Sequence, residues 1–242
     1  MPPAPQPELP YRPYRHNLWR VIEAQSRVAT MGIVDTIDEQ AVLERALEDT
    51  KPPIPAPCRH LNYQFRSPFR YGKYPRDSRF RRAGRTPGVW YGSEEPLTAV
   101  CESVWGALRF YAASPATPMP RRPVEHSAVQ ADIRVARAVD LTAPEMANQW
   151  RWADPKDYRD CLALADRVRA EGGGAIRYAS ARHPDHWPNV AVLGCDAFAQ
   201  PDPIGRQTWH IMLNRRLVRA DCETLRQQHM FVAGETKLLH AA

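Results

Sequence analysis

The sequence GVWYGSEEPLTAVCESV, from Gly88 to Val104, places a short apolar strand directly before an amphipathic helix. Its first part, GVWYG, is rich in aromatic and β-branched residues, which favour a strand. PLTAVCESVWGALRFYA, from Pro96 to Ala112, has apolar residues at helical spacing and a proline near its start, where proline is tolerated. This stretch therefore predicts a fold that mixes strands and helices.

Short strands surround this unit on both sides. The expected strands are LNYQF (61–65), SAVQADIRVARAVDL (127–141, one strand or two around a turn), AIRYAS (175–180), NVAVLG (189–194), TWHIML (208–213) and RRLVRA (215–220). One more helix is expected within residues 154–174, where three glycines end it. The regular alternation of a Rossmann domain is missing, and no GxGxxG follows a strand. We expect an α+β domain with a mixed or mainly antiparallel sheet.

The N-terminal part is expected to be a helical appendage. Residues 1–16 are rich in proline and arginine and predict an irregular arm. The apolar residues between Leu18 and Ala29 recur at helical spacing, and Thr36 with Glu39 forms a capping-box pattern at the start of a second helix. KPPIPAPC, from Lys51 to Cys58, ends that helix. We expect an arm and helical hairpin at 1–57 and the main domain at 58–242.

Composition narrows the class of protein. The 242 residues are 43% hydrophobic and 25% charged, which is typical of a globular domain. No apolar stretch is long enough to span a membrane, and the N-terminus lacks the features of a secretory signal, so we expect a cytoplasmic protein. Five scattered cysteines without a CxxC pair predict reduced, mostly buried thiols.

The net charge of +6 raises the alternative of a nucleic-acid-binding module. However, 29 of the 33 basic residues are arginine, a skew typical of GC-rich genomes. Recognition helices, zinc-finger spacings and aromatic RNA-binding strands are all missing. Arginine also binds phosphate and carboxylate through paired hydrogen bonds, so an anionic ligand explains the charge equally well.

Three segments combine reactive groups with apolar strands, and together they resemble the RES-domain family. The matching motifs are PFRY (68–71), SRF (78–80), YGS (91–93), TAVCE (98–102), IRYASAR (176–182) and NVAV (189–192). They occur in the family's order from about residue 60 to 218. The segment VIEAQSRVATMGIVDTIDEQAVLE also resembles the helical preamble of longer members, whereas HPDHWP is longer than the family's usual loop.

The resemblance implies an ADP-ribosyltransferase-like fold in a RES domain at 58–242, with NAD⁺ as substrate. Family members are toxins that a partner antitoxin with an Xre-type helix-turn-helix domain holds inactive. The implied activities are hydrolysis or phosphorolysis of NAD⁺, or transfer of ADP-ribose to a protein. The acceptor therefore remains open between water, phosphate and a protein side chain, and a strictly protein-directed ADP-ribosyltransferase is the alternative.

The chemistry of NAD⁺ cleavage suggests roles for individual residues. Positive charge develops on the ribose as nicotinamide leaves, so a carboxylate is needed beside it, and arginines suit the pyrophosphate. Glu102 lies off the apolar face of its helix and is the candidate carboxylate. The candidate catalytic residues are Glu102, Arg79, Tyr91 and Ser180, and the candidate NAD⁺-binding residues are Arg70, Tyr71, Arg79, Tyr91, Ser180, Arg182 and Asn189.

Each of these residue types has a chemical reason. Tyr91 offers a face for stacking on nicotinamide, and Ser180 is expected to hydrogen-bond the amide or ribose rather than act as a nucleophile, because no GxSxG surrounds it. His183 and His186 have a spacing that suits a metal, but no third ligand accompanies them, so we expect no metal.

Overall fold

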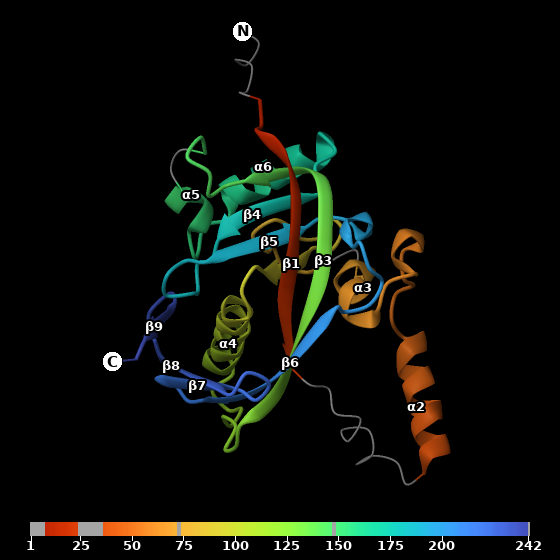
Figure 1. The fold of residues 1–242 in the computed structure, drawn as a ribbon. Helices are drawn as coiled ribbons and strands as arrows, with labels where there is room; N and C mark the ends of the chain where they lie inside the picture. Colours follow the sequence, from red (N-terminus) through yellow and green to blue (C-terminus); the bar gives the residue numbers. More distant parts are fainter. Residues whose placement is uncertain (1–7, 24–35, 72–73, 147–148, 242) are drawn as a thin grey trace.

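The computed structural model describes residues 8–23, 36–71, 74–146 and 149–241. In these ranges a nine-stranded sheet has the order β1-β2-β5-β4-β3-β6-β7-β8-β9 (Figure 1). The strands are β1 (Tyr11–Glu23), β2 (Trp90–Ser93), β3 (Val124–Asp140), β4 (Ala175–Ala179), β5 (Pro188–Val192), β6 (Gly205–Leu213), β7 (Leu217–Cys222), β8 (Gln227–Ala233) and β9 (Leu238–His240). Only β3 and β4 pair in parallel, so the mixed, mainly antiparallel α+β architecture is confirmed.

Two long strands, β1 and β3, run side by side through the molecule (Figure 1). Segment 127–141 belongs to one continuous strand of 17 residues rather than to two strands around a turn. Since β1 also pairs with β2, the strands β1, β2, β5, β4 and β3 close a ring of pairings. The site described below lies where β1 and β2 meet.

The expected helix from Leu18 onward is wrong, and so is the expected irregular arm over residues 11–16, because residues 11–23 form β1. Leu18 pairs with Ala131, and Ile22 pairs with Ser127. Val21 and Ile22 are β-branched and fit a strand, and β3 supplies backbone partners along the whole segment. The remainder of the predicted helix, at 24–29, lies outside the described residues. The predicted helical hairpin is therefore not found, and its first half is part of the central sheet.

The second N-terminal helix, α2 (Ile37–Asp49), starts as predicted. The side chain of Thr36 accepts a hydrogen bond from the backbone of Glu39, and the Glu39 carboxylate accepts one from the backbone of Thr36. This reciprocal pair satisfies two N–H groups that would otherwise have no partner at the helix start. The helices α4 (Pro96–Ala113) and α6 (Arg159–Ala170) also lie where the sequence predicts them, and α5 (Gln149–Ala153) precedes α6.

The segment predicted as the strand LNYQF begins a helix instead, α3 (Tyr63–Arg70). Asn62 caps it by accepting a hydrogen bond from the backbone of Gln64. Phe65 and Phe69 are four residues apart and therefore lie on one face of the helix, which is buried. The segment that leads into β2 approaches α3 closely at Gly88, where a Cβ would lie 1.7 Å from the Pro68 carbonyl oxygen, so only glycine fits.

The core is organised around the sheet. One group of buried residues joins α3 to β2 and β5 through stacked and edge-on rings, including Phe65, Trp90 and Phe198. A second group packs Val100 and Val104 of α4 against β6, β7 and β8. As a result, α4 is fixed along its apolar face, and its other face is turned toward the ends of β1 and β2.

The expectation that the thiols are all reduced is wrong for one pair. Cys58 and Cys195 form a disulfide with a Cα–Cα distance of 5.3 Å, and each lies in a short 3-10 helix, Ala56–Cys58 and Cys195–Ala197. The other three cysteines, Cys101, Cys161 and Cys222, are buried free thiols. Among the described helices, none is long and apolar enough to cross a membrane.

Candidate active site

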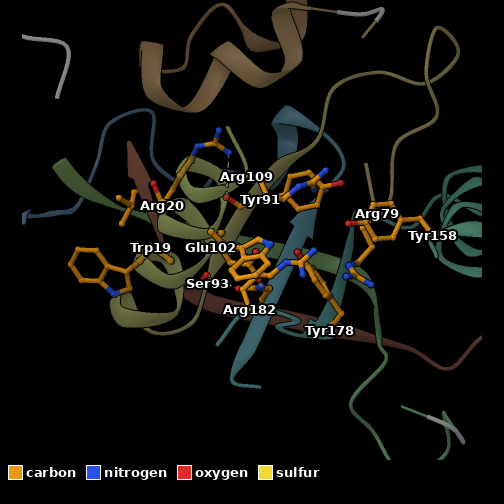
Figure 2. A pocket seen from close by; sticks show the side chains of 17 residues that line it. Trp19, Arg20, Arg79, Tyr91, Ser93, Glu102, Arg109, Tyr158, Tyr178 and Arg182 are labelled. Carbon is orange, nitrogen blue, oxygen red and sulfur yellow. Dashed lines mark hydrogen bonds between the residues drawn. The ribbon is translucent and has the colours of Figure 1, made fainter. Parts of the chain in front are cut away.

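A cavity of about 350 Å³ opens between α4 and the ends of β1, β2 and β4. Figure 2 shows Glu102 near the centre of its lining, with Trp19 on one side and Arg79 and Tyr158 on the other. Its lining consists of Trp19, Arg20, Val21, Arg79, Tyr91, Gly92, Ser93, Ala99, Glu102, Ser103, Trp105, Gly106, Arg109, Tyr158, Tyr178, Arg182 and Asn189. Such a volume lies in the range of small-molecule sites.

Glu102 is the only carboxylate that lines this cavity in the described part of the chain, and one of its oxygens is held by two donors. The hydroxyl of Ser180 donates to Oε1 over 2.7 Å, and the side-chain amide of Asn189 donates to the same oxygen over 2.7 Å. No described residue donates to the second oxygen, Oε2. The carboxylate is therefore fixed through one oxygen and leaves the other available to a ligand.

The surroundings of Ser180 determine which way its proton points. Its Oγ accepts hydrogen bonds from the backbone N–H groups of Arg182 (3.1 Å) and His183 (3.0 Å), and the side chain is fully buried. A serine hydroxyl has one proton, which here is donated to Glu102. Ser180 thus holds Glu102 in place and is not among the cavity-lining residues, in contrast to the predicted direct contact with nicotinamide or ribose.

Asn189 is oriented in a similar way by Ser93. These residues are directly opposite each other in the antiparallel pair of β5 and β2. The Ser93 hydroxyl donates to the Asn189 amide oxygen over 2.6 Å, so the amide nitrogen is the group that faces Glu102. Both side chains are buried, which makes the arrangement rigid and excludes water from it.

Arg79 is a buried cation without a carboxylate partner in the described structure. The side chain is 8% exposed, and its guanidinium lies 4.8 Å from the ring centre of Tyr158 and 5.7 Å from that of Tyr178. Nη1 donates to the Trp152 carbonyl over 2.6 Å, while Nε and Nη2 have no hydrogen-bond partner among the described residues. These free donors make Arg79 suited to binding an anion such as phosphate.

The hydroxyl of Tyr91 stabilises the turn that carries Arg79. This hydroxyl lies 2.9 Å from the Ser78 hydroxyl and accepts a hydrogen bond from the backbone of Phe80 over 3.2 Å. Burial raises the pKa of Tyr91, so the phenol stays neutral. The structure therefore gives Tyr91 two functions, since its ring lines the cavity and its hydroxyl holds the turn that carries Arg79.

The cavity is strongly cationic, because four arginines line it. Arg182 is tied to the carbonyls of Thr236 and Pro155 and lies over the Trp105 ring. Arg20 donates to the Tyr91 carbonyl, and burial lowers its pKa. The described contacts give no carboxylate partner to any of these four guanidinium groups, which are those of Arg20, Arg79, Arg109 and Arg182. This charge favours an anionic ligand.

Besides Ser180, two predicted site residues, Arg70 and Tyr71, are not among the cavity-lining residues. The Arg70 guanidinium donates to the Glu48 carboxylate over 2.5 Å and to the Pro52 carbonyl, which joins α3 to α2. Tyr71 is exposed and lies edge-on to Tyr74. The PFRY motif that carries both residues lies at the end of α3, which directs them away from the cavity.

Several lining residues were missed although some had a sequence signal. Tyr178 lies on β4 two residues before Ser180, and residues two apart in an extended segment point to the same side. Arg109 follows Glu102 by seven residues, which returns it to the same side of α4. No sequence motif points to Trp19 or Arg20, because the apolar spacing of their segment predicts a helix rather than a strand beside the cavity.

No group of three or more His, Cys, Asp or Glu side chains with metal-binding geometry occurs in the described ranges. Burial lowers the pKa of His183 to about 4, and its Nδ1 accepts a hydrogen bond from the Asp185 backbone. His186 points its Nδ1 to the Ser180 carbonyl. The two histidines therefore have separate structural partners.

Comparison with known proteins identifies the family. No curated protein sequence matches the chain. The crystal structure of the M. tuberculosis MbcT–MbcA toxin–antitoxin complex contains a similar chain, with a TM-score of 0.46 and 10% sequence identity over 81% of this chain and 85% of that one. The sequence model of the RES domain matches residues 54–214, about two thirds of the protein. The chain therefore belongs to the RES domain family.

Proposed function

We propose that this RES-domain protein breaks the nicotinamide–ribose bond of NAD⁺ and acts as the toxin of a toxin–antitoxin pair, with an ADP-ribosyltransferase-like fold. The observation that carries the proposal is the state of Glu102. It is a single carboxylate, held through one oxygen by Ser180 and Asn189, in a cavity that four arginines line.

Cleavage of this bond requires the stabilisation of a cation more than the protonation of a leaving group. Nicotinamide departs as a neutral molecule from a pyridinium, while the ribose gains positive charge. Glu102 Oε2 is available to hydrogen-bond a ribose hydroxyl and to stabilise that charge electrostatically. Because the two donors already hold Oε1, the carboxylate does not have to reorganise during the reaction.

The remaining groups of the cavity suit the rest of the dinucleotide. The free donors of Arg79 fit a phosphate oxygen pair, and Arg20 and Arg109 extend the positive charge along the opening. Aromatic rings on both sides of Glu102, including Trp105 and Tyr178, provide faces for the nicotinamide ring. The acceptor is water, phosphate or a protein side chain, and the test below distinguishes them.

The proposed partner is an antitoxin with an Xre-type helix-turn-helix domain. An acidic side chain or C-terminal carboxylate of the antitoxin would find the arginines of this cavity unpaired by carboxylates of the described chain. Inhibition would then follow from occupation of the phosphate positions. The direct nucleic-acid contact of such a pair is assigned to the antitoxin.

The proposal is tested by incubating the purified protein with NAD⁺, with and without phosphate, and measuring nicotinamide release. Free ADP-ribose, a phosphorylated ADP-ribose, or label in a protein band identifies the acceptor. Glu102→Gln should lower kcat by about 100- to 1,000-fold, the effect of losing one electrostatic contact to the transition state. Glu95→Gln is the matched control, since Glu95 lies exposed on the same helix without a side-chain capping bond.

Two results would count against the proposal. A folded protein that releases no nicotinamide in buffer or in lysate would exclude NAD⁺ cleavage. Full activity in Glu102→Gln would remove this carboxylate from the mechanism. Strong, salt-dependent binding of DNA or RNA by the isolated chain would instead favour a nucleic-acid-binding module.

A further inference from the structure

The C-terminal segment 236–240, called the clamp below, lies against residues 180–187, called the serine loop. The backbone N–H of Leu238 donates to the Arg182 carbonyl over 3.0 Å, and Arg182 Nη1 donates to the Thr236 carbonyl over 2.5 Å. The clamp lies beyond the matched RES domain, which ends at residue 214. A segment outside the family's region thus contacts the loop that carries Ser180.

Lys237 makes the most specific contacts between the clamp and the serine loop. Its ammonium group donates to the Pro184 carbonyl over 2.8 Å and lies 3.0 Å from His186 Nε2. His186 Nδ1 lies 2.7 Å from the Ser180 carbonyl. An ammonium has only donors and a carbonyl only accepts, so His186 must be the neutral tautomer that accepts at Nε2 and donates from Nδ1. Two consecutive hydrogen bonds therefore connect Lys237 to the backbone of Ser180.

The serine loop has a conformation that needs such support. His186 adopts a φ of 57°, a left-handed conformation that is unfavourable for residues other than glycine. The loop is closed by a hydrogen bond from the Ser180 backbone to the Trp187 carbonyl. The same loop supplies the N–H groups of Arg182 and His183 that orient the Ser180 hydroxyl. A shift of the loop would therefore displace the donor to Glu102.

We infer that Lys237 and His186 are positioning residues that hold Ser180 in hydrogen-bonding geometry with Glu102. This inference rests on the proposed function, because it assigns the clamp to the geometry of the same carboxylate. Lys237 is partly buried, and both of its hydrogen bonds end on the serine loop. Arg182 and Leu238 connect the clamp and the loop through backbone carbonyls, whereas the side-chain pair of His240 and Asp185 is exposed and contributes little by comparison.

The test compares Lys237→Met, which keeps the apolar stem and removes the donors, with Lys237→Arg. Lys51→Met, just after α2, is the matched control. Lys237→Met should lower kcat for NAD⁺ cleavage by about 10- to 100-fold with little change in KM, because a misplaced reacting group affects the chemical step. Lys237→Arg should recover part of this loss, and Lys51→Met should behave as wild type. His186→Asn should match Lys237→Met, and the double variant should be no worse than either single one, since both act through one connection.

Hydrogen exchange of the peptide spanning 180–187 gives a readout that does not depend on activity. Lys237→Met should raise exchange in this peptide by about tenfold while the strands of the sheet exchange as in wild type. Unchanged exchange would overturn the inference, whether or not the wild type cleaves NAD⁺. Raised exchange with unchanged kcat would show a structural contact without a positioning role and would also overturn it. A wild type that releases no nicotinamide would refute the proposed function, while exchange still decides whether Lys237 holds the loop.

Discussion

The substitution Asn189→Asp places a second carboxylate against Glu102 with almost no change of shape. The amide nitrogen of Asn189 lies 2.7 Å from Glu102 Oε1, and Ser93 would continue to donate to the other oxygen of the new side chain. Asn189 is 2% exposed, so water cannot separate the two charges. Two carboxylates at this distance cannot both stay ionised, and we expect the pair to retain one shared proton.

The size of the effect follows from the geometry. Two charges centred about 4 Å apart repel by about 4 kcal/mol at an effective dielectric constant of about 20. Free carboxylic acids ionise near pH 4. Because of this repulsion, which is worth about 3 pH units, the pair should keep one shared proton up to about pH 7. In that window the folded variant binds one proton more than the unfolded chain. The free energy of unfolding of the variant is therefore highest at acid pH. Within this window it falls by about 1.4 kcal/mol for each pH unit that the pH rises.

The measurement is urea unfolding of wild type and Asn189→Asp between pH 4.5 and pH 7.5. The difference in the free energy of unfolding should grow with pH, and nicotinamide release by the variant should fall over the same range. Asn214→Asp is the matched control, because Asn214 lies exposed in the turn after β6 and its side-chain oxygen accepts hydrogen bonds from backbone N–H groups there. A stability difference that does not change with pH would refute the close contact between Asn189 and Glu102.

Two further predictions concern groups outside this contact. Replacing Cys58 and Cys195 by serine removes a covalent link between residues 137 apart in the sequence. In urea unfolding without reductant, this should lower the free energy of unfolding by about 3 to 5 kcal/mol. A wild type that unfolds identically with and without reductant would contradict the disulfide. Burial lowers the pKa of His183 to about 4. Between about pH 6.5 and pH 4, this side chain therefore binds a proton in the unfolded chain but not in the folded one. Stability should therefore fall by at most about 3 kcal/mol as the pH falls from about 6.5 to about 4, and a His183 imidazole resonance that titrates near 6.5 would contradict this.

The elements that the sequence predicts well are those whose pattern and partners are local. The apolar spacing of α4 places Glu102 off the buried face, and the capping pair of Thr36 and Glu39 marks the start of α2. The short strands β4 and β5 are apolar runs bounded by turn residues. Their motifs also contain Ser180 and Asn189, so the two groups that hold Glu102 could be named from the sequence.

The elements that were misassigned depend on distant partners. The composition of residues 11–16 predicts an irregular arm and the apolar spacing from Leu18 predicts a helix, and only the presence of β3 as a continuous partner makes segment 11–23 a strand. The five residues LNYQF are too few to show a period, and the cap at Asn62 decides for a helix. The disulfide joins residues 137 apart, a pairing that the number and spacing of cysteines do not reveal.

Errors in the elements led directly to errors in the site. The PFRY motif makes Arg70 a candidate for binding NAD⁺, but at the end of α3 its guanidinium is held by Glu48. Conversely, Arg20 lines the cavity because its segment is a strand, whereas the sequence pattern predicts a helix there. Of the three predicted arginines, Arg79 and Arg182 line the cavity and Arg70 does not, while the unpredicted Arg20 and Arg109 also line it. The chemistry of a reaction indicates which residue types its site needs. The pairing of β1 with β3, however, determines which of the many arginines reach the cavity.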